Sequence, residues 1–209
     1  MALLPFDELN TPKVDVEPPE RYFAKMDISK EQKKERIKAT NDFYDVLLFL
    51  FALLAIETEL TEDYGFAYNE FYARFGNVVR KYGRMDEYMQ DYIDQRTKEI
   101  FDTTKEQMPL GGWWTSSDRA TALGENDANS VLNYEELQKA LESGYRFKEW
   151  RGMMDYRERK DHVKMEGRKI PIDEYFVFPD CMMLMPHDEI NGTAKQVANC
   201  RCSLKYSKE

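Results

Sequence analysis

The chain has 209 residues, of which 42% are hydrophobic and 33% are charged. This composition excludes disordered, collagen-like and disulfide-rich proteins and predicts a globular protein with an apolar core of its own. Thirty basic residues against 39 acidic ones give a net charge of -9. A surface of this sign argues against duplex DNA as the main ligand, because binding to phosphates depends on cationic patches.

The chain has three cysteines, Cys181, Cys200 and Cys202. This odd number, with two members so close together, does not indicate a disulfide framework. The first ten residues have no basic segment and no sustained apolar segment, so they do not look like a secretory signal. The most apolar stretch, 46–56, is well short of the roughly 20 residues that span a bilayer. We therefore expect reduced thiols, a buried helix, assembly in the cytoplasm and no membrane partner.

Residues 1–28 are expected to form an extended arm, because they contain four prolines and no helical or strand period. A long helix is predicted from Ser29 to about residue 62, with Ser29 as the N-cap and Gln32 in the capping-box position. Its second half is apolar on nearly every side, so it must be covered by its own chain or by a partner. The sequence leaves both options open. The candidate partner-binding residues on this helix are Phe43, Leu47, Leu50, Phe51 and Leu54.

Helical patterns continue at 64–82 and from 85 to about 106. A short helix is expected from about Ser117, interrupted or ended by Gly124, and another is expected from Asn133. Residues 29–143 together form a predicted helical region. At its start, the basic residues of 30–38 (Lys30, Lys33, Lys34, Arg36 and Lys38) could contact DNA. The acidic residues between them suit a solvated helix start equally well.

From residue 144 the pattern becomes that of a small α+β module. Residues 145–151 alternate aromatic and charged side chains, which predicts a strand. A short helix at 157–166 is expected to end at Gly167, and 169–177 is expected to be an extended chain or hairpin confined to an edge by Pro171. A loop at 179–186, a helical turn from Thr193 and a strand at 200–206 follow. The predicted fold class is α+β, with a mainly helical N-terminal two-thirds followed by a small α+β C-terminal module at 144–209.

The polar residues of this module gather in three clusters. They are Asp155, Arg157, Arg159 and His162; Pro186, His187 and Asp188; and Asn199, Cys200, Arg201 and Cys202. Imidazole and thiolate are the usual ligands of zinc, so His162, Cys200 and Cys202 could hold a structural zinc ion. They could also be core residues, and the arginines a solvated salt-bridge cluster. An alternative function is a metal-dependent hydrolase or nuclease that uses Asp155 or Asp188 as the base.

Several motifs of the module occur in a set order. They are Gly144-Tyr145-x-Phe147-Lys148-Glu149-Trp150, Asp155-x-Arg157-x-Arg159-x-x-His162, Gly167, Ile170-x-Ile172-x-x-x-Phe176, Met185-Pro186-x-Asp188, Ala194 and Asn199-Cys200-Arg201-Cys202. This series resembles the phage Mu F-like minor head proteins, also called phage head morphogenesis or minor capsid proteins. The resemblance covers roughly residues 144–206, with a weaker likeness at 113–129.

The resemblance implies a structural protein without catalytic residues, present in few copies in the procapsid and virion. It implies a place inside the capsid near the portal, with the portal protein and/or the major capsid protein as partners and, in some relatives, delivery with the DNA. The motif residues would then form a structural cluster of the module. This cluster contains Trp150, Asp155, Arg157, Arg159, His162, Gly167, Pro186, Asp188, Asn199, Cys200, Arg201 and Cys202.

Overall fold

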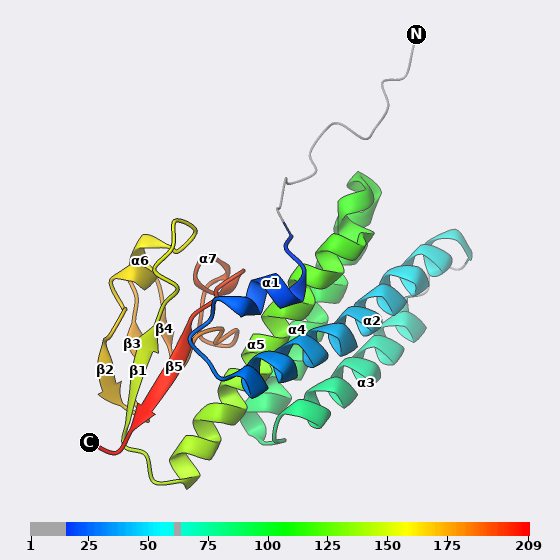
Figure 1. Ribbon diagram of the computed structural model, residues 1–209. Helices are drawn as coiled ribbons and strands as arrows, with labels where there is room; N and C mark the ends of the chain where they lie inside the picture. Colours follow the sequence, from blue (N-terminus) through cyan, green and yellow to red (C-terminus); the bar gives the residue numbers. More distant parts are fainter. Residues whose placement is uncertain (1–15, 61–63) are drawn as a thin grey trace.

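A computed structural model of the protein describes residues 16–60 and 64–209. Four long helices lie side by side as a bundle, and a small α+β module packs beside it (Figure 1). The helical part consists of α1 (Pro19–Ala24), α2 (Lys30–Leu60), α3 (Gly65–Tyr82), α4 (Glu87–Gln107), the 3-10 turns η2 (Met108–Leu110) and η3 (Gly112–Thr115), and α5 (Ser117–Glu142). The module consists of β1 (Phe147–Arg151), α6 (Lys160–Val163), β2 (Lys169–Pro171), β3 (Phe176–Val177), β4 (Met182–Met183), α7 (Ala194–Val197) and β5 (Ser203–Ser207). The predicted α+β class is confirmed.

The start of α2 carries the predicted capping box. The Gln32 backbone N–H donates to Ser29 Oγ at 3.1 Å, and the Ser29 N–H donates to Gln32 Oε1 at 2.8 Å. Each side chain thus satisfies a backbone donor that the first turn of a helix leaves unpaired. The reciprocal pair fixes the point at which the chain enters the bundle.

The apolar stripes of α2 form the centre of the bundle core, packed against α3 and α5. This corrects the expectation that they bind a partner, because side chains that are already buried within the chain offer no surface for docking. The apolar character of α2 on nearly every side is explained by helices of the same chain on more than one side. The exposed fractions of the five candidate partner-binding side chains are 0% for Phe43, Leu47, Leu50 and Leu54 and 3% for Phe51.

The segment Lys30–Thr58 of α2 is long and apolar enough to cross a membrane by length and composition alone. Core helices of globular proteins meet the same criterion, and 39% of its most apolar window is buried inside the protein. The helix also buries the charged Arg36 completely. We therefore describe α2 as a core helix of the bundle.

Arg36 is the polar anchor between α2 and α5. Its guanidinium donates to Glu136 at 2.7 Å, to Asn133 at 2.8 Å and to Asn129 at 3.1 Å. A buried guanidinium is tolerated only with such partners, because removing a charge from water costs several kcal/mol. Arg36 is therefore unavailable to DNA, which corrects the prediction for this member of the basic segment 30–38.

Helix α5 runs without a break through Gly124, so the predicted end of a helix at Gly124 and the predicted new start at Asn133 are both wrong. Gly124 faces α2, and a Cβ at this position would lie 2.9 Å from the Thr40 carbonyl oxygen. Glycine here allows two helix backbones to approach closely, which is a tertiary role that local sequence does not reveal.

The expected extended arm at 1–28 is only partly within the described residues, since 1–15 lie outside them. Within the rest, α1 corrects the expectation: Pro19 starts this helix, where its fixed φ is favourable. Tyr22, Phe23 and Met26 are buried. The helix lies between the bundle and the module (Figure 1).

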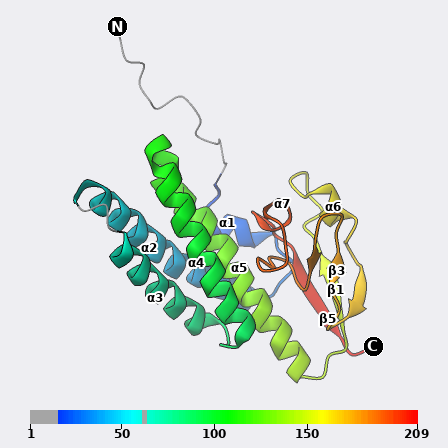
Figure 2. The same cartoon turned by 180° about the vertical axis from the view of Figure 1, so that it is seen from behind.

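The module is built on two antiparallel sheets, seen from the opposite side in Figure 2. β1 is the central strand, pairing with β2 and with β5, and β3 pairs with β4. Pro171 does lie in an edge strand, as predicted. The stretch 169–177 is not a hairpin, because its two strands belong to different sheets, and β4 lies inside the predicted loop 179–186. One face of β1 is fully buried at Lys148 and Trp150.

Candidate functional site

The Asn-Cys-Arg-Cys segment, residues 199–202, contacts several distant parts of the chain at once. Asn199 has a positive φ of 53°, a conformation that asparagine tolerates better than most residues. Its backbone N–H donates to Asn126 Oδ1 of α5 at 2.9 Å. The Cys200 carbonyl accepts a hydrogen bond of 2.8 Å from the Tyr22 hydroxyl of α1. The segment thus fastens both α1 and α5 to the module.

Arg201 holds the loop after β1. It donates two hydrogen bonds, both of 2.8 Å, to the two carboxylate oxygens of Asp155. Burial alone would raise the pKa of Asp155, but the bonds from Arg201 lower it below its ordinary value. The arginines close to Asp155 in sequence have other partners: Arg157 pairs with Glu17 at 3.1 Å, and Arg159 donates to a backbone carbonyl just before the segment. The predicted local salt-bridge cluster is therefore replaced by long-range contacts.

His162, Cys200 and Cys202 come together as a buried cluster, with one nitrogen and two sulfurs all within 4.8 Å of one another. His162 Nδ1 lies 3.3 Å from Cys202 Sγ and 3.5 Å from Cys200 Sγ. On the other side of the ring, His162 Nε2 lies 3.1 Å from Gln196 Oε1 of α7. The candidate metal ligands are thus adjacent in space, while the third cysteine, Cys181, lies outside the cluster.

The cluster favours one thiolate. Burial alone would raise the pKa of Cys200, but hydrogen bonds from Cys202 and His162 bring it well below the ordinary thiol value. Burial and the neighbouring Cys200 raise the pKa of Cys202. Burial lowers the pKa of His162, and the hydrogen bond with Cys200 outweighs it and raises the value. An imidazole beside a thiolate can either share a proton or bind a soft metal ion.

Trp150 of β1 and Gly167 of the turn after α6 lie beside this cluster. The Trp150 ring is fully buried and meets the His162 ring edge to face, with centroids 5.4 Å apart. Gly167, with a φ of 71°, turns the chain after α6 so that its N–H donates to the Trp150 carbonyl at 2.9 Å. The helix predicted at 157–166 is shorter than expected: α6 is only four residues long and ends at Val163, and a turn leads from there to Gly167. Trp150 and Gly167 position the histidine.

Asp188 is fully buried and is occupied as a hydrogen-bond acceptor. It accepts from the Tyr88 hydroxyl of α4 at 2.8 Å and from the Leu184 N–H at 2.7 Å. The Pro186 carbonyl accepts from Asn133 of α5 at 2.9 Å. These contacts attach the loop after β4 to the bundle, so Asp188 and Pro186 are connecting residues and the structure gives Asp188 no free oxygen aimed at the cysteines.

The cavity beside the cysteine and histidine cluster is very small. Its volume is about 10 Å³, and Glu158, His162, Cys200 and Cys202 are among its lining residues. A space of this size holds about one water molecule. It is too small to enclose a substrate of the size that a hydrolase or nuclease would cut.

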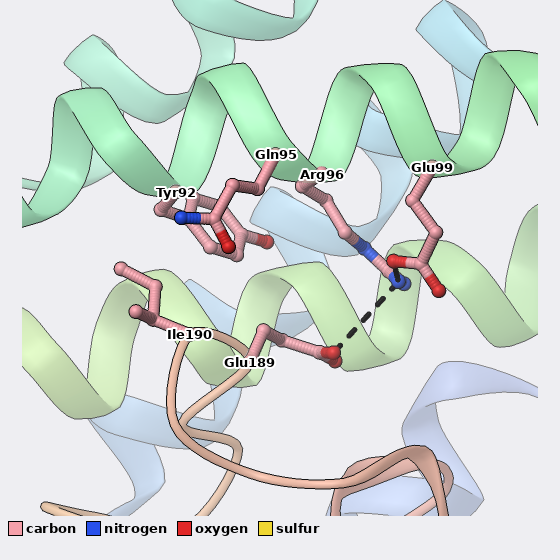
Figure 3. A pocket seen from close by; sticks show the side chains of 6 residues that line it. All are labelled: Tyr92, Gln95, Arg96, Glu99, Glu189 and Ile190. Atoms are coloured by element: carbon pink, nitrogen blue, oxygen red, sulfur yellow. Dashed lines mark hydrogen bonds and ion pairs between the residues drawn. The ribbon is translucent and has the colours of Figure 1, made fainter.

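A larger cavity lies between α4 and the loop after β4, with a volume of about 250 Å³ (Figure 3). Arg96 points across it toward Glu189, at 3.8 Å, and is held by Asp127 at 2.7 Å and Glu99 at 2.8 Å. Two of these carboxylates, Glu99 and Glu189, line the cavity beside the single guanidinium, so it does not suit a phosphate. Its lining residues are Tyr92, Gln95, Arg96, Glu99, Glu189 and Ile190.

Sequence reasoning missed this buried ionic network. Burial raises the pKa of Asp127 and of Glu189, in both cases against the lowering effect of Arg96. In the sequence, Arg96 and Asp127 look like any surface charge on a helix. The one available signal is position: Arg96 falls on the same helix face as Tyr92 and Ile100, four residues away on either side.

Comparison with known proteins identifies a family. The family model described as phage Mu protein F like protein matches residues 93–205, more than half of the chain. No curated protein and no solved structure matches the chain. The matched range begins inside α4 and includes α5 and nearly all of the module, so it extends well beyond the motifs at 144–206.

All of the contacts of the Asn-Cys-Arg-Cys segment with α5, α6 and α7 lie within the matched range, and so do the cysteine and histidine cluster and the buried network of Arg96. The chain therefore belongs to the phage Mu protein F-like family, a family of structural proteins of bacteriophage head morphogenesis found in the virion.

Proposed function

We propose that the protein is a low-copy structural component of the phage procapsid and virion that lies inside the capsid and binds the portal protein. The observation that carries this proposal is the family match over residues 93–205. The helices α1, α2 and α3 precede the matched range. We assign the contact with the portal to a surface made mostly by this part of the chain and completed by the turn after α4, because the module and α5 are the part that the family shares.

The exposed end of the bundle, made by the end of α2, the start of α3 and the turn after α4, is the surface we assign to this contact. Its apolar side chains Ile56, Phe66 and Leu110 are 51%, 62% and 59% exposed. The ends of α2 and α4 meet there, since Thr58 Oγ1 lies 3.9 Å from the Met108 sulfur. Large apolar side chains gathered at one exposed end are typical of a protein-binding surface.

Quantitative mass spectrometry of purified procapsids and virions, with the portal protein as internal standard, tests the copy number. Chemical crosslinking in the same particles tests the partner. We expect a few copies per particle and crosslinks from residues around the bundle end to the portal. Crosslinks to the major capsid protein alone, or a copy number close to that of the major capsid protein, would contradict the proposal.

A pair of variants tests the surface. Phe66→Ser with Leu110→Ser should reduce incorporation into particles about tenfold, as expected for the loss of apolar anchors at an interface. Tyr175→Ser with Val177→Ser, which changes two exposed apolar residues of the module, is the matched control. Equal incorporation of the two double variants, both folded by circular dichroism, would show that the bundle end is not the contact.

We further propose that the protein contacts the DNA during packaging and is delivered with it. The exposed residues Lys30, Lys34 and Lys38 remain available at the start of α2. Comparing intact virions with particles emptied of DNA measures whether the protein leaves. DNA affinity that does not fall with added salt would exclude a contact made through phosphates.

We also propose that this role involves no catalysis. Of the two candidate bases, Asp155 is held by Arg201 and Asp188 by Tyr88 and backbone N–H groups. Incubation of the purified protein with duplex DNA and divalent metal should give no cleavage. Cleavage by the wild type that is lost in His162→Ala would support the hydrolase alternative instead.

A further inference from the structure

We infer that His162, Cys200 and Cys202 bind one zinc ion, which fastens the last strand of the module to α6. The inference is independent of the proposed contact with the portal. All three residues are buried, with exposed fractions of 1% for His162 and 2% for each cysteine. Their ligand atoms converge on a common point, with no pair more than 4.8 Å apart.

The distances between the ligand atoms fit a tetrahedral zinc ion. Zinc binds a histidine nitrogen at about 2.0 Å and a cysteine sulfur at about 2.3 Å, so nitrogen and sulfur ligands of one tetrahedron lie about 3.5 Å apart. His162 Nδ1 lies 3.3 Å from Cys202 Sγ and 3.5 Å from Cys200 Sγ. An ion therefore fits between the three atoms with little movement of the side chains.

The far side of the histidine ring is arranged as in metal sites. Gln196 Nε2 donates to Asp180 Oδ1 at 2.7 Å, which turns its amide oxygen toward His162. That oxygen lies 3.1 Å from His162 Nε2 and accepts a hydrogen bond from its N–H. When the ring is neutral, as it is in a histidine that binds a metal, the Nδ1 lone pair is directed at the two sulfurs. Metal-bound histidines almost always have such an acceptor on their other nitrogen, because it fixes the tautomer and the orientation of the ring.

The donor set and its surroundings select zinc and a structural role. Two thiolates and one imidazole are soft and borderline ligands, which magnesium and calcium do not prefer. His162, Cys200 and Cys202 all line the cavity of about 10 Å³, which has room for about one water molecule beside the three ligands. Glu158 borders that cavity, with Oε1 3.7 Å from Cys202 Sγ. A fourth ligand fits there, but a substrate does not.

A bound metal ion would stabilise the module, because its own apolar core is small. The apolar core beneath its sheets contains nine buried residues, two of which are Cys200 and Cys202 themselves. The metal would join two segments about 40 positions apart in the chain, α6 and the start of β5, and both are short. Small scaffolds commonly rely on a metal or a disulfide where the apolar core alone is insufficient.

Metal content and cobalt spectra of the full-length protein test the inference. We expect about one zinc per chain after purification without chelator. After removal of the metal, titration with Co²⁺ should give the charge-transfer absorption of thiolate-bound cobalt, saturating near one equivalent and reversed by added Zn²⁺. Cys200→Ser, Cys202→Ser and His162→Gln should each lose most of this signal. Cys181→Ser should keep all of it, because Cys181 lies outside the cluster.

The cobalt titration of the wild type decides the test even if a variant fails to fold. A metal-free wild type that is folded by circular dichroism and gives no thiolate-to-cobalt absorption would overturn the inference. Loss of the signal in Cys181→Ser, or its retention in Cys202→Ser, would overturn it as well. A thermal transition that falls on chelation in the wild type and in Cys181→Ser, and recovers with Zn²⁺ alone, would establish the structural role.

Discussion

The replacement Glu125→Gln should stabilise the protein, and by an amount that depends on pH. Glu125 is a buried residue of α5, only 2% exposed, and its Oε1 has no hydrogen-bond partner. Burial, with a further contribution from the charge of Glu17, raises its pKa from 4.5 to about 8. The folded protein therefore holds a proton at neutral pH that the unfolded chain has released.

The sign and size of the effect follow from this difference. Because the pKa is higher in the folded state, the unfolded state binds fewer protons between pH 4.5 and about 8, and stability falls as the pH rises through that window. Each pH unit above the ordinary pKa costs about 1.4 kcal/mol, so the cost at pH 7 is about 3 kcal/mol. An uncharged glutamine avoids this cost. It should raise the unfolding free energy by about 2 kcal/mol at pH 7, after allowance for its own unpaired amide.

Urea denaturation of the wild type and the variant, followed by circular dichroism at several pH values across this window, is the measurement. The gain should be small at the acidic end and grow toward pH 8. Glu35→Gln, at an exposed position of α2, is the control and should change stability little at any pH. A gain that is constant with pH, or a loss of stability at pH 7, would show that the Glu125 carboxyl is not kept protonated by burial.

Three further replacements test the packing. Gly124→Ala should cost about 1–3 kcal/mol of stability because its Cβ would meet a backbone oxygen at 2.9 Å, whereas Gly112→Ala, with open space around it, should not. Arg36→Ala should cost about 3–5 kcal/mol by leaving buried partners unpaired, and exposed Lys34→Ala should be nearly neutral. Tyr22→Phe removes one buried hydrogen bond and should cost about 1 kcal/mol. Urea denaturation at neutral pH measures all of these, and a neutral Arg36→Ala would refute the anchoring role.

Local signals in the sequence predicted much of the fold. The capping box of Ser29 and Gln32 predicted the start of α2, and the alternation around Trp150 predicted β1. Gly124 was misinterpreted because a glycine that ends a helix and a glycine that lets another helix approach look alike in one sequence. The proline-rich start hid α1 for a similar reason, since Pro19 can begin a helix as well as prevent one.

The residues of the candidate site could be predicted from the sequence, but the partners that they contact could not. Both cysteines and His162 could be named from residue type alone, because few other side chains bind zinc. The partner of Asp155 could not, since Arg201 is far away in sequence while Arg157 is two residues away. For the apolar face of α2, cover by its own chain and cover by a partner both stayed open, because sequence patterns show that a helix is covered and do not show by which chain.

The hydrogen bond from Tyr22 to Cys200 also sets an order of events during synthesis. The two residues are 178 positions apart. A ribosome adds residues from the N-terminus, and helical segments with local contacts form quickly once they emerge. The Cys200 carbonyl that Tyr22 of α1 binds does not exist until the chain has been translated as far as residue 200. The first described helix of the protein therefore reaches its final place late, and its closing contact reports that the Asn-Cys-Arg-Cys segment has been made.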